Sequence, residues 1–165
     1  MPASDQHIEP RRYKLVPRTA IFLRKGNSYL LLQGAANKRR WAGVYNGIGG
    51  HIEPGEDVLT SARRELLEET GLQADLWLCG TVMVDVGEIG IGLYVLTGKQ
   101  TGGELRESAE GRAEWIPFDR VRLLPTVDDV PVLVGRIHQM HLGEPPFCAV
   151  STYDRSGRLR IDFAE

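Results

Sequence analysis

One short segment, residues 50–72, constrains this chain more than any other feature of its sequence. It runs GHIEPGEDVLTSARRELLEETGL, a glycine-rich turn followed by a stretch of helical period. Val58, Ala62 and Leu66 recur at intervals of four, so they lie on one face of a helix. Gly71 predicts the end of that helix, because glycine commonly follows a last turn. The segment therefore predicts a loop, a helix and a second loop.

The predicted helix, between Asp57 and Thr70, carries Glu65, Glu68 and Glu69 at positions i, i+3 and i+4. These spacings put the three carboxylates on one helix face, where like charges repel one another. A solvated acidic face is one interpretation of this cluster. A divalent cation is the other, because Mg²⁺ prefers carboxylate oxygens and often bridges to substrate phosphates.

The whole segment resembles the box motif of the Nudix hydrolases, G-x5-E-x7-R-E-U-x-E-E-x-G-U, in which U is a bulky aliphatic residue. The positions that match are Gly50, Glu56, Arg64, Glu65, Leu66, Glu68, Glu69, Gly71 and Leu72. Every specified position of the motif is therefore present at the required spacing. The resemblance implies an α/β/α sandwich, a mixed sheet flanked by helices, within the α/β or α+β class.

The same resemblance implies a role for individual residues. The expected ligands of Mg²⁺ or Mn²⁺ are Glu65, Glu68, Glu69 and the backbone carbonyl of Gly49. Arg64 and Glu56 are expected to form an ion pair that orients these ligands. The implied activity is that of a Mg²⁺-dependent pyrophosphohydrolase, in which metal ions polarise a diphosphate and activate water.

A fourth carboxylate outside the box is common in this family. Glu110 precedes the predicted strand Trp115–Pro117, where such a residue often lies. It is a candidate metal ligand or base, and a solvated loop glutamate is the alternative.

The box does not specify a substrate, because specificity comes from residues elsewhere in a fold. The run that precedes the box glycines is similar to the approach strand of MutT-like oxidised-purine triphosphatases. Asn46 matches the residue whose amide bonds the base in those enzymes. Trp41 either stacks on a base or packs in the core. Asp128 and Asp129 match a paired aspartate of that group, although capping of a second helix is the favoured interpretation.

These features predict hydrolysis of a diphosphate linkage in a nucleoside triphosphate or a related nucleoside diphosphate derivative. An oxidised purine nucleotide, similar to 8-oxo-dGTP, is the expected substrate, in sanitation of the nucleotide pool. One alternative is a Nudix hydrolase for nucleotide sugars or dinucleoside polyphosphates. The other is a non-catalytic Nudix domain that senses a nucleotide, although such domains usually lose box glutamates that this chain keeps.

The rest of the sequence predicts a mostly β architecture around the box helix. Apolar or alternating runs predict strands at residues 19–23, 29–33, 45–48, 76–86, 89–97 and 115–117, and a terminal hairpin from 148–153 and 159–163. A second helix is expected to begin near Val130, beside Pro131. Residues 1–14 are predicted to form a flexible tail and residues 15–165 a single domain.

Composition limits the partners of the chain. A formal net charge of −2 over 165 residues predicts no general affinity for nucleic acid. No apolar run approaches the ~20 residues of a membrane span, so no membrane partner is predicted. We expect a cytoplasmic monomer or homodimer that acts on a small nucleotide. Cys79 and Cys148 stand in apolar surroundings and are predicted to be reduced core residues.

Overall fold

The computed structural model describes residues 5, 9, 11–38 and 40–165. The strands are β1 (Lys14–Lys25), β2 (Ser28–Gly34), β3 (Tyr45–Asn46), β4 (Leu72–Val84), β5 (Ile89–Gly103), β6 (Gly111–Pro117), β7 (Phe147–Tyr153) and β8 (Leu159–Phe163). The helices are α1 (Val58–Thr70), α2 (Phe118–Val121) and α3 (Val130–Gln139). Most of the predicted tail lies outside the described residues, and its last residue, Lys14, already belongs to β1.

The strands form one mixed sheet of eight strands, in the order β3-β2-β1-β5-β4-β7-β8, with β6 paired to β2. A parallel pairing at its centre joins β1 to β5, from Lys14 opposite Ile89 to Leu23 opposite Gly98. β4 then pairs antiparallel with β5 and parallel with β7. The predicted hairpins β1–β2 and β7–β8 are both formed.

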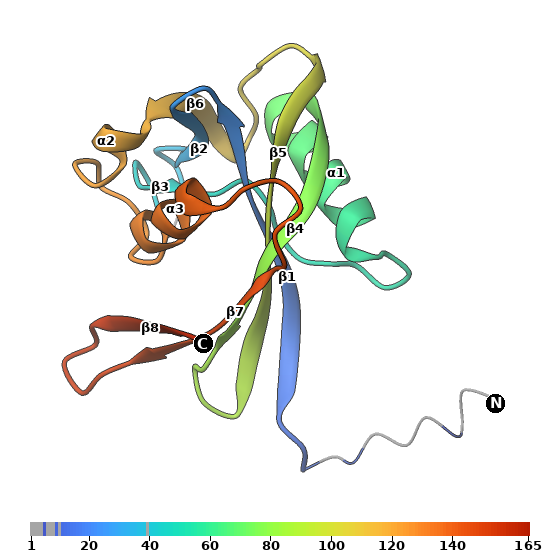
Figure 1. Cartoon of the computed structure of the whole chain (residues 1–165), viewed down its shortest axis with the longest axis vertical. Coiled ribbons are helices and arrows are strands. Elements are labelled where there is room, and N and C mark those ends of the chain that lie inside the picture. The colour runs from blue at the N-terminus through green and yellow to red at the C-terminus, as the bar shows by residue number, and fades with distance from the viewer. Residues whose placement is uncertain (1–4, 6–8, 10, 39) are drawn as a thin grey trace.

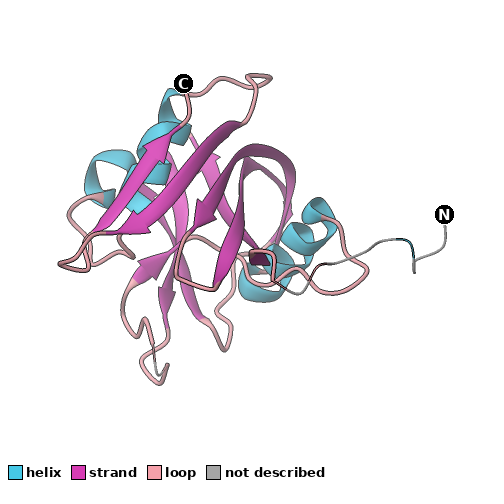
Figure 2. Cartoon of the chain, turned by 90° about the horizontal axis from the view of Figure 1, so that it is seen from below, coloured by secondary structure: helices cyan, strands magenta, loops and turns pink. Residues whose placement is uncertain are grey.

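Helices cover both faces of this sheet (Figures 1 and 2). On one face, Leu66 of α1 packs in a core that includes Ile21. On the other face, Ile137 of α3 packs in a second core that includes Phe22. Consecutive strand residues point to opposite faces, so Ile21 and Phe22 of β1 belong to different cores. The α/β/α sandwich and the mixed sheet are thereby confirmed.

Helix α1 begins and ends as predicted. The Asp57 carboxylate accepts hydrogen bonds from the backbone N–H groups of Leu59 at 2.8 Å and Thr60 at 3.0 Å. Gly71 ends the helix in the left-handed conformation, with φ of 76°, and its N–H bonds the carbonyl of Leu67 at 2.9 Å. At 13 residues α1 is the longest helix in the described part of the chain, where no helix has the length and apolarity to cross a bilayer.

Several strands are longer than predicted, and one cysteine is misplaced by the prediction. The predicted strand 19–23 is the buried part of β1, whose polar outer residues still pair through their backbone with β5. Cys79 is buried, as expected, but Cys148 is exposed, and both thiols are free. Cys148 lies between Phe147 and Ala149 on β7, where buried and exposed residues alternate, so it faces away from the core.

The cap of α1 can be tested by substitution. We expect Asp57→Ala to lower the free energy of unfolding by about 1 kcal/mol, because two N–H groups of the first turn lose their acceptor. Asp57→Ser keeps a capping oxygen and should restore most of that loss. Urea titration followed by circular dichroism measures both values. Equal stability of the three proteins would show that the cap contributes nothing.

Candidate active site

The glycine-rich loop before α1 is held along β1. Thr19 N–H bonds the carbonyl of Gly50 at 2.9 Å, and Ile21 N–H bonds that of Ile48 at 2.7 Å. Gly49 has a φ of 139°, and a Cβ added there would lie 2.4 Å from the carbonyl oxygen of Thr19. Because that neighbour is backbone, only glycine allows the loop to approach β1 this closely.

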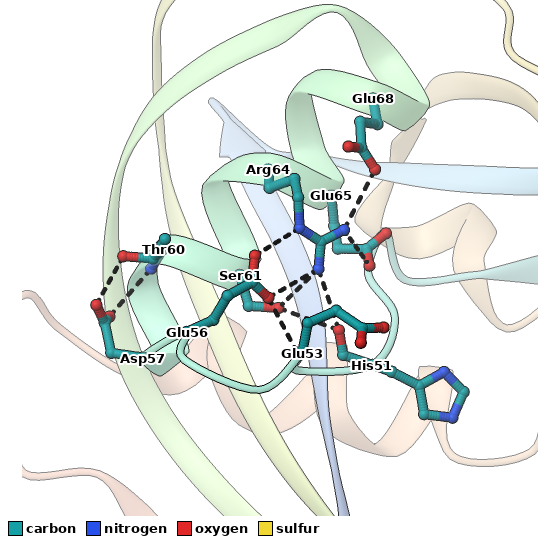
Figure 3. A network of polar contacts seen from close by, with 9 residues as sticks. All are labelled: His51, Glu53, Glu56, Asp57, Thr60, Ser61, Arg64, Glu65 and Glu68. Carbon is teal, nitrogen blue, oxygen red and sulfur yellow. Dashed lines mark hydrogen bonds and ion pairs between the residues drawn. The ribbon is translucent and has the colours of Figure 1, made fainter.

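Arg64 lies at the centre of a polar network that joins the loop to α1 (Figure 3). Its Nε donates to Glu56 at 2.7 Å, and its Nη1 donates to Glu65 at 2.9 Å and to Glu68 at 3.2 Å. Its Nη2 also donates to the backbone carbonyl of His51 at 3.2 Å. The hydrogen bond from Arg64 lowers the pKa of Glu56 to about 2. The predicted Arg64–Glu56 ion pair is therefore formed, and Arg64 contacts two further box glutamates as well.

Glu69 differs from the other box glutamates because its side chain is buried. The residue is 6% exposed, and its Oε2 accepts a hydrogen bond from Gly49 N–H at 3.2 Å. Burial, together with the neighbouring carboxylates of Glu65 and Glu110, raises the pKa of Glu69 to about 8 against the opposing effect of the Gly49 bond. A buried negative charge at this position therefore lacks sufficient compensation from the protein.

The box glutamates open onto a cavity of about 430 Å³, which we call the carboxylate cavity. Its acidic lining consists of Glu53, Glu65, Glu68, Glu69 and Glu110. As the side chains stand, no three metal-binding groups in the described residues converge on one point. Arg64 holds Glu65 and Glu68, and Lys38 holds Glu110 through an ion pair.

The chemistry of this lining suits a hard divalent cation. Carboxylate oxygens are the donors that Mg²⁺ prefers. A cation would also compensate the charge of Glu69, whose raised pKa reflects burial beside Glu65 and Glu110. The groups that can hold such an ion are the carboxylates of Glu65, Glu68, Glu69 and Glu110 and the carbonyl of Gly49.

A second, smaller cavity of about 120 Å³ adjoins the first, and we call it the Asn46 cavity. The two cavities share Gly49, Glu69 and Glu110 as lining residues. Asn46 and Trp41 both line the smaller one, as do Lys38 and Arg40. The pairing of β2 with β6 closes this arrangement, since it brings the turn at Glu110 beside the loop that follows β2.

Two predicted base-binding residues have distinct settings in the Asn46 cavity. Trp41 is 55% exposed, so packing in the core is the wrong alternative, and its φ of 68° is unusual for a residue with a side chain. The Asn46 side-chain oxygen accepts a hydrogen bond from Gly47 N–H at 2.8 Å. The amide of Asn46 therefore supports the glycine loop in addition to facing the cavity.

The paired aspartates lie beside β3 but line neither cavity. Val127 N–H bonds the carbonyl of Tyr45 at 2.9 Å, which holds their segment against that strand. Asp129 occupies the N-cap position of α3, but its backbone angles are helical and its side chain makes no capping hydrogen bond, so the favoured capping interpretation is wrong for Asp129. One Asp129 carboxylate oxygen is buried without a hydrogen-bond partner, and burial, followed by the charge of Asp128, raises the pKa of Asp129.

Lys38 and His51 belong to the site although the sequence did not single them out. Lys38 pairs with Glu110 at the boundary between the two cavities. The basic run 37–40 was the available signal, although its residue 39 lies outside the described residues. The backbone carbonyl of His51 accepts a hydrogen bond from Arg64. Because every residue type has such a carbonyl, the sequence could not identify this role.

Comparison with known families decides the assignment. The family model of the NUDIX domain matches residues 14–133. The chain belongs to the Nudix family. The match begins with β1 and ends within α3, so it includes the glycine loop, the box helix and the turn at Glu110.

Named relatives of this Nudix chain include proteins of oxidised-nucleotide metabolism. It is 35% identical over 94 residues to an oxidized purine nucleoside triphosphate hydrolase of Danio rerio, an alignment that covers 55% of this chain and 60% of that protein. It is 33% identical over 105 residues to an 8-oxo-dGDP phosphatase of Homo sapiens, over 59% of this chain and 31% of the relative. The match thus spans less than two thirds of either relative.

A solved structure extends the likeness over most of the Nudix chain. The mutator MutT protein of Bacillus halodurans superposes with a TM-score of 0.71 at 27% identity, over 90% of this chain and 97% of that one. The sandwich and its box helix are therefore shared with a MutT structure along nearly their whole length.

Burial of Glu69 predicts a pH-dependent stability of the metal-free protein. The raised pKa means that the folded chain keeps this proton between pH 4.5 and about 8, whereas the unfolded chain loses it. The penalty of the buried charge is therefore absent below pH 4.5 and complete above pH 8. In excess chelator at pH 8, Glu69→Gln should be more stable than the unaltered protein by at least about 1.4 kcal/mol, the equivalent of one pKa unit.

Urea titration at pH 5 and pH 8 measures this difference. Glu68→Gln is the matched control, because it removes the same charge from the same helix at a side chain that is 60% exposed. A Glu69→Gln advantage of the same size at both pH values would contradict the raised pKa.

Proposed function

We propose that this Nudix chain hydrolyses the diphosphate linkage of a nucleoside triphosphate, with an oxidised purine nucleotide as its preferred substrate. The observation that carries the proposal is the shared wall of the two cavities, formed by Gly49, Glu69 and Glu110. A base in the Asn46 cavity would direct its phosphate chain over the box carboxylates. The named relatives act on oxidised purine nucleotides, which supports the same substrate class here.

The residues of the box have separate roles in this proposal. The carboxylates of Glu65, Glu68, Glu69 and Glu110 would hold Mg²⁺ or Mn²⁺, together with the carbonyl of Gly49. A bound divalent cation supplies polarisation of the diphosphate and lowers the pKa of water. Arg64 holds Glu65 and Glu68 in place through its hydrogen bonds and is itself anchored to Glu56.

Hydrolysis itself replaces one P–O bond by another. A water oxygen bonds to phosphorus, and one of the carboxylates that line the carboxylate cavity accepts the proton that this water loses. The bridging P–O bond breaks, and its electron pair leaves with the departing phosphate group. From a nucleoside triphosphate the products are a nucleoside monophosphate and pyrophosphate.

The base is proposed to be read by the amide of Asn46. An amide offers both a donor and an acceptor, which suits the edge of a purine. In the structure its oxygen is bonded to Gly47, so the –NH₂ group is the part available to a base. Trp41, exposed on the same cavity, offers an indole face on which a base can stack. Asp128 and Asp129 lie beside β3, the strand that contains Asn46, and they are further candidates for contact with the base.

A substrate panel separates this proposal from its rivals. 8-oxo-dGTP, dGTP, a nucleotide sugar and a dinucleoside polyphosphate are each incubated with the protein and Mg²⁺, and release of pyrophosphate or phosphate is measured. The highest kcat/KM is expected for 8-oxo-dGTP. Preference for the sugar or the dinucleoside polyphosphate would favour another Nudix substrate class. No turnover of any nucleotide, with binding retained, would favour a sensing domain.

Metal dependence and Glu69 can be tested together. We expect no hydrolysis in excess chelator and recovery on addition of Mg²⁺ or Mn²⁺. Glu69→Gln should lower kcat at least ~100-fold, about 2.7 kcal/mol in the barrier, because a hard cation requires the charge that the amide lacks. Isothermal titration with Mn²⁺ should show weaker metal binding in the same variant. Near-normal kcat would remove Glu69 from the site.

The role of Asn46 requires two variants, because its oxygen also supports the glycine loop. Asn46→Asp keeps an acceptor for Gly47 N–H but loses the –NH₂ donor, whereas Asn46→Ala loses both. We expect Asn46→Asp to lower kcat/KM for the best purine triphosphate by about ten- to a hundredfold, the cost of one unpaired polar group. Asn46→Asp also adds a negative charge to a cavity that Glu69 and Glu110 line, so the readout is the ratio of kcat/KM between the best purine and a poor pyrimidine substrate. An unchanged ratio in Asn46→Asp would mean that another residue reads the base.

A further inference from the structure

The molecule has a third cavity that the proposed reaction does not use. It has a volume of about 390 Å³ and lies where the C-terminal end of α3 meets strands β1, β4 and β5. Trp77 and Ile137, which line it, belong to the core beneath α3, whereas the box helix packs in the other core. None of its lining residues lines the carboxylate cavity or the Asn46 cavity. We call it the Trp77 cavity.

The walls of the Trp77 cavity are apolar. Its large apolar lining residues are Trp77, Ile137, Met140 and Leu142. Leu142 is 73% exposed, so its side chain is accessible to a ligand. The volume lies within the range of about 300–1,000 Å³ that is typical of sites for small organic ligands.

The charged side chains of the Trp77 cavity are all basic. They are Arg24 and Lys99, the neighbouring imidazole is that of His141, and no carboxylate is found among the described lining residues. His141 pairs with Glu144, but neither Arg24 nor Lys99 forms an ion pair in the described part of the chain. Two cations beside an apolar wall therefore stand without an anionic partner.

The nearest acidic neighbour on the sheet does not neutralise these cations. Asp75 of β4 lies opposite Lys99 of β5 in the antiparallel register. Its carboxylate makes no ion pair with Lys99 and does not line the cavity. The Arg24 Nε–H is bonded to the carbonyl of Gly26 at 3.1 Å, which steadies this guanidinium while leaving its outer N–H groups for another acceptor.

We propose that the Trp77 cavity is a binding site for a small amphipathic anion, an aromatic or aliphatic group that carries a carboxylate or sulfonate. The apolar part of such a ligand packs against Trp77 and Met140. Its anionic group accepts hydrogen bonds from Arg24 and Lys99, contacts that are stronger than those between neutral groups. The site is separate from the proposed hydrolysis, because the ligand contacts no residue of the two other cavities.

The test uses a pair of probes that differ in charge. 1-Anilinonaphthalene-8-sulfonate carries the anionic group, and N-phenyl-1-naphthylamine is the same ring system without it. Fluorescence titration of the full chain should show one saturable site for the sulfonate and much weaker binding of the neutral amine. Among the three tryptophan indole N–H signals in a ¹H–¹⁵N spectrum, only that of Trp77 should shift with the sulfonate. A shift confined to Trp41 or Trp115 would overturn the assignment.

Substitutions of exposed or half-exposed side chains locate the two halves of the site. Arg24→Gln and Lys99→Gln should each weaken sulfonate binding about tenfold, the loss of one charge-assisted hydrogen bond. Leu142→Asp should abolish it, since it removes an apolar wall and adds an anion. The matched control is Lys25→Gln, whose ammonium lies 5.6 Å from the ring centre of Trp115 and outside the cavity. It should bind the sulfonate normally.

Two outcomes of the binding titrations would also overturn the proposal. One is equal binding of the two probes, and the other is sulfonate binding that Arg24→Gln, Lys99→Gln and Lys25→Gln alter alike. Thermal unfolding of each variant, measured in parallel, shows that a loss of binding is not a loss of fold. Saturating 8-oxo-dGTP with chelator present should leave sulfonate binding unchanged. Displacement by the nucleotide would mean that the probe occupies the reaction site.

Discussion

The rest of the site depends on the hydrogen bonds that the guanidinium of Arg64 donates. It bonds Glu56 and the carbonyl of His51 in the loop, and Glu65 and Glu68 on the helix. One planar cation therefore sets the position of two box carboxylates relative to the glycine loop, and it offsets the repulsion between them. Glu69 receives no bond from Arg64, and the single hydrogen bond from Gly49 N–H does not compensate its buried carboxylate, whose pKa stays raised.

The two cavities are joined by contacts that are distant in sequence. The β2–β6 pairing places Gly111 opposite Gly34, and Ala35 N–H bonds the carbonyl of Glu110 at 3.0 Å. The turn at Glu110, which follows the box in sequence, therefore lies beside the basic loop at Lys38, which precedes the box. The ion pair of Lys38 with Glu110 follows from that juxtaposition. A residue of the Asn46 cavity thereby contacts a residue of the carboxylate cavity directly.

The α/β/α sandwich was expected only through the resemblance to the Nudix box, and what periodicity and spacing could predict was local. The helix, its Asp57 and Gly71 boundaries and the one-face glutamates follow from periodicity within a single segment, and the structure has them all. Trp41 and Asp129 could not be placed in that way, because their burial depends on loops packed by other elements. The pattern that favoured capping by Asp129 is common before helices, but the backbone of Asp129 is already helical and its side chain makes no capping hydrogen bond. Cys148 was misplaced because an apolar neighbourhood in sequence does not reveal which face of a strand is covered.

The parallel pairing of β1 with β5 has a consequence for the order of folding. Residues near 14–23 can meet those near 89–98 only after a long stretch of chain has closed between them, and such closure is slow because its entropy is lost before contacts form. Helix α1 needs only local contacts and can form early. The glycine loop, however, is held along β1 by the backbone hydrogen bonds of Thr19 and Ile21. A partly folded or newly synthesised chain can thus have a box helix while its glycine loop is not yet in place, until the centre of the sheet is complete.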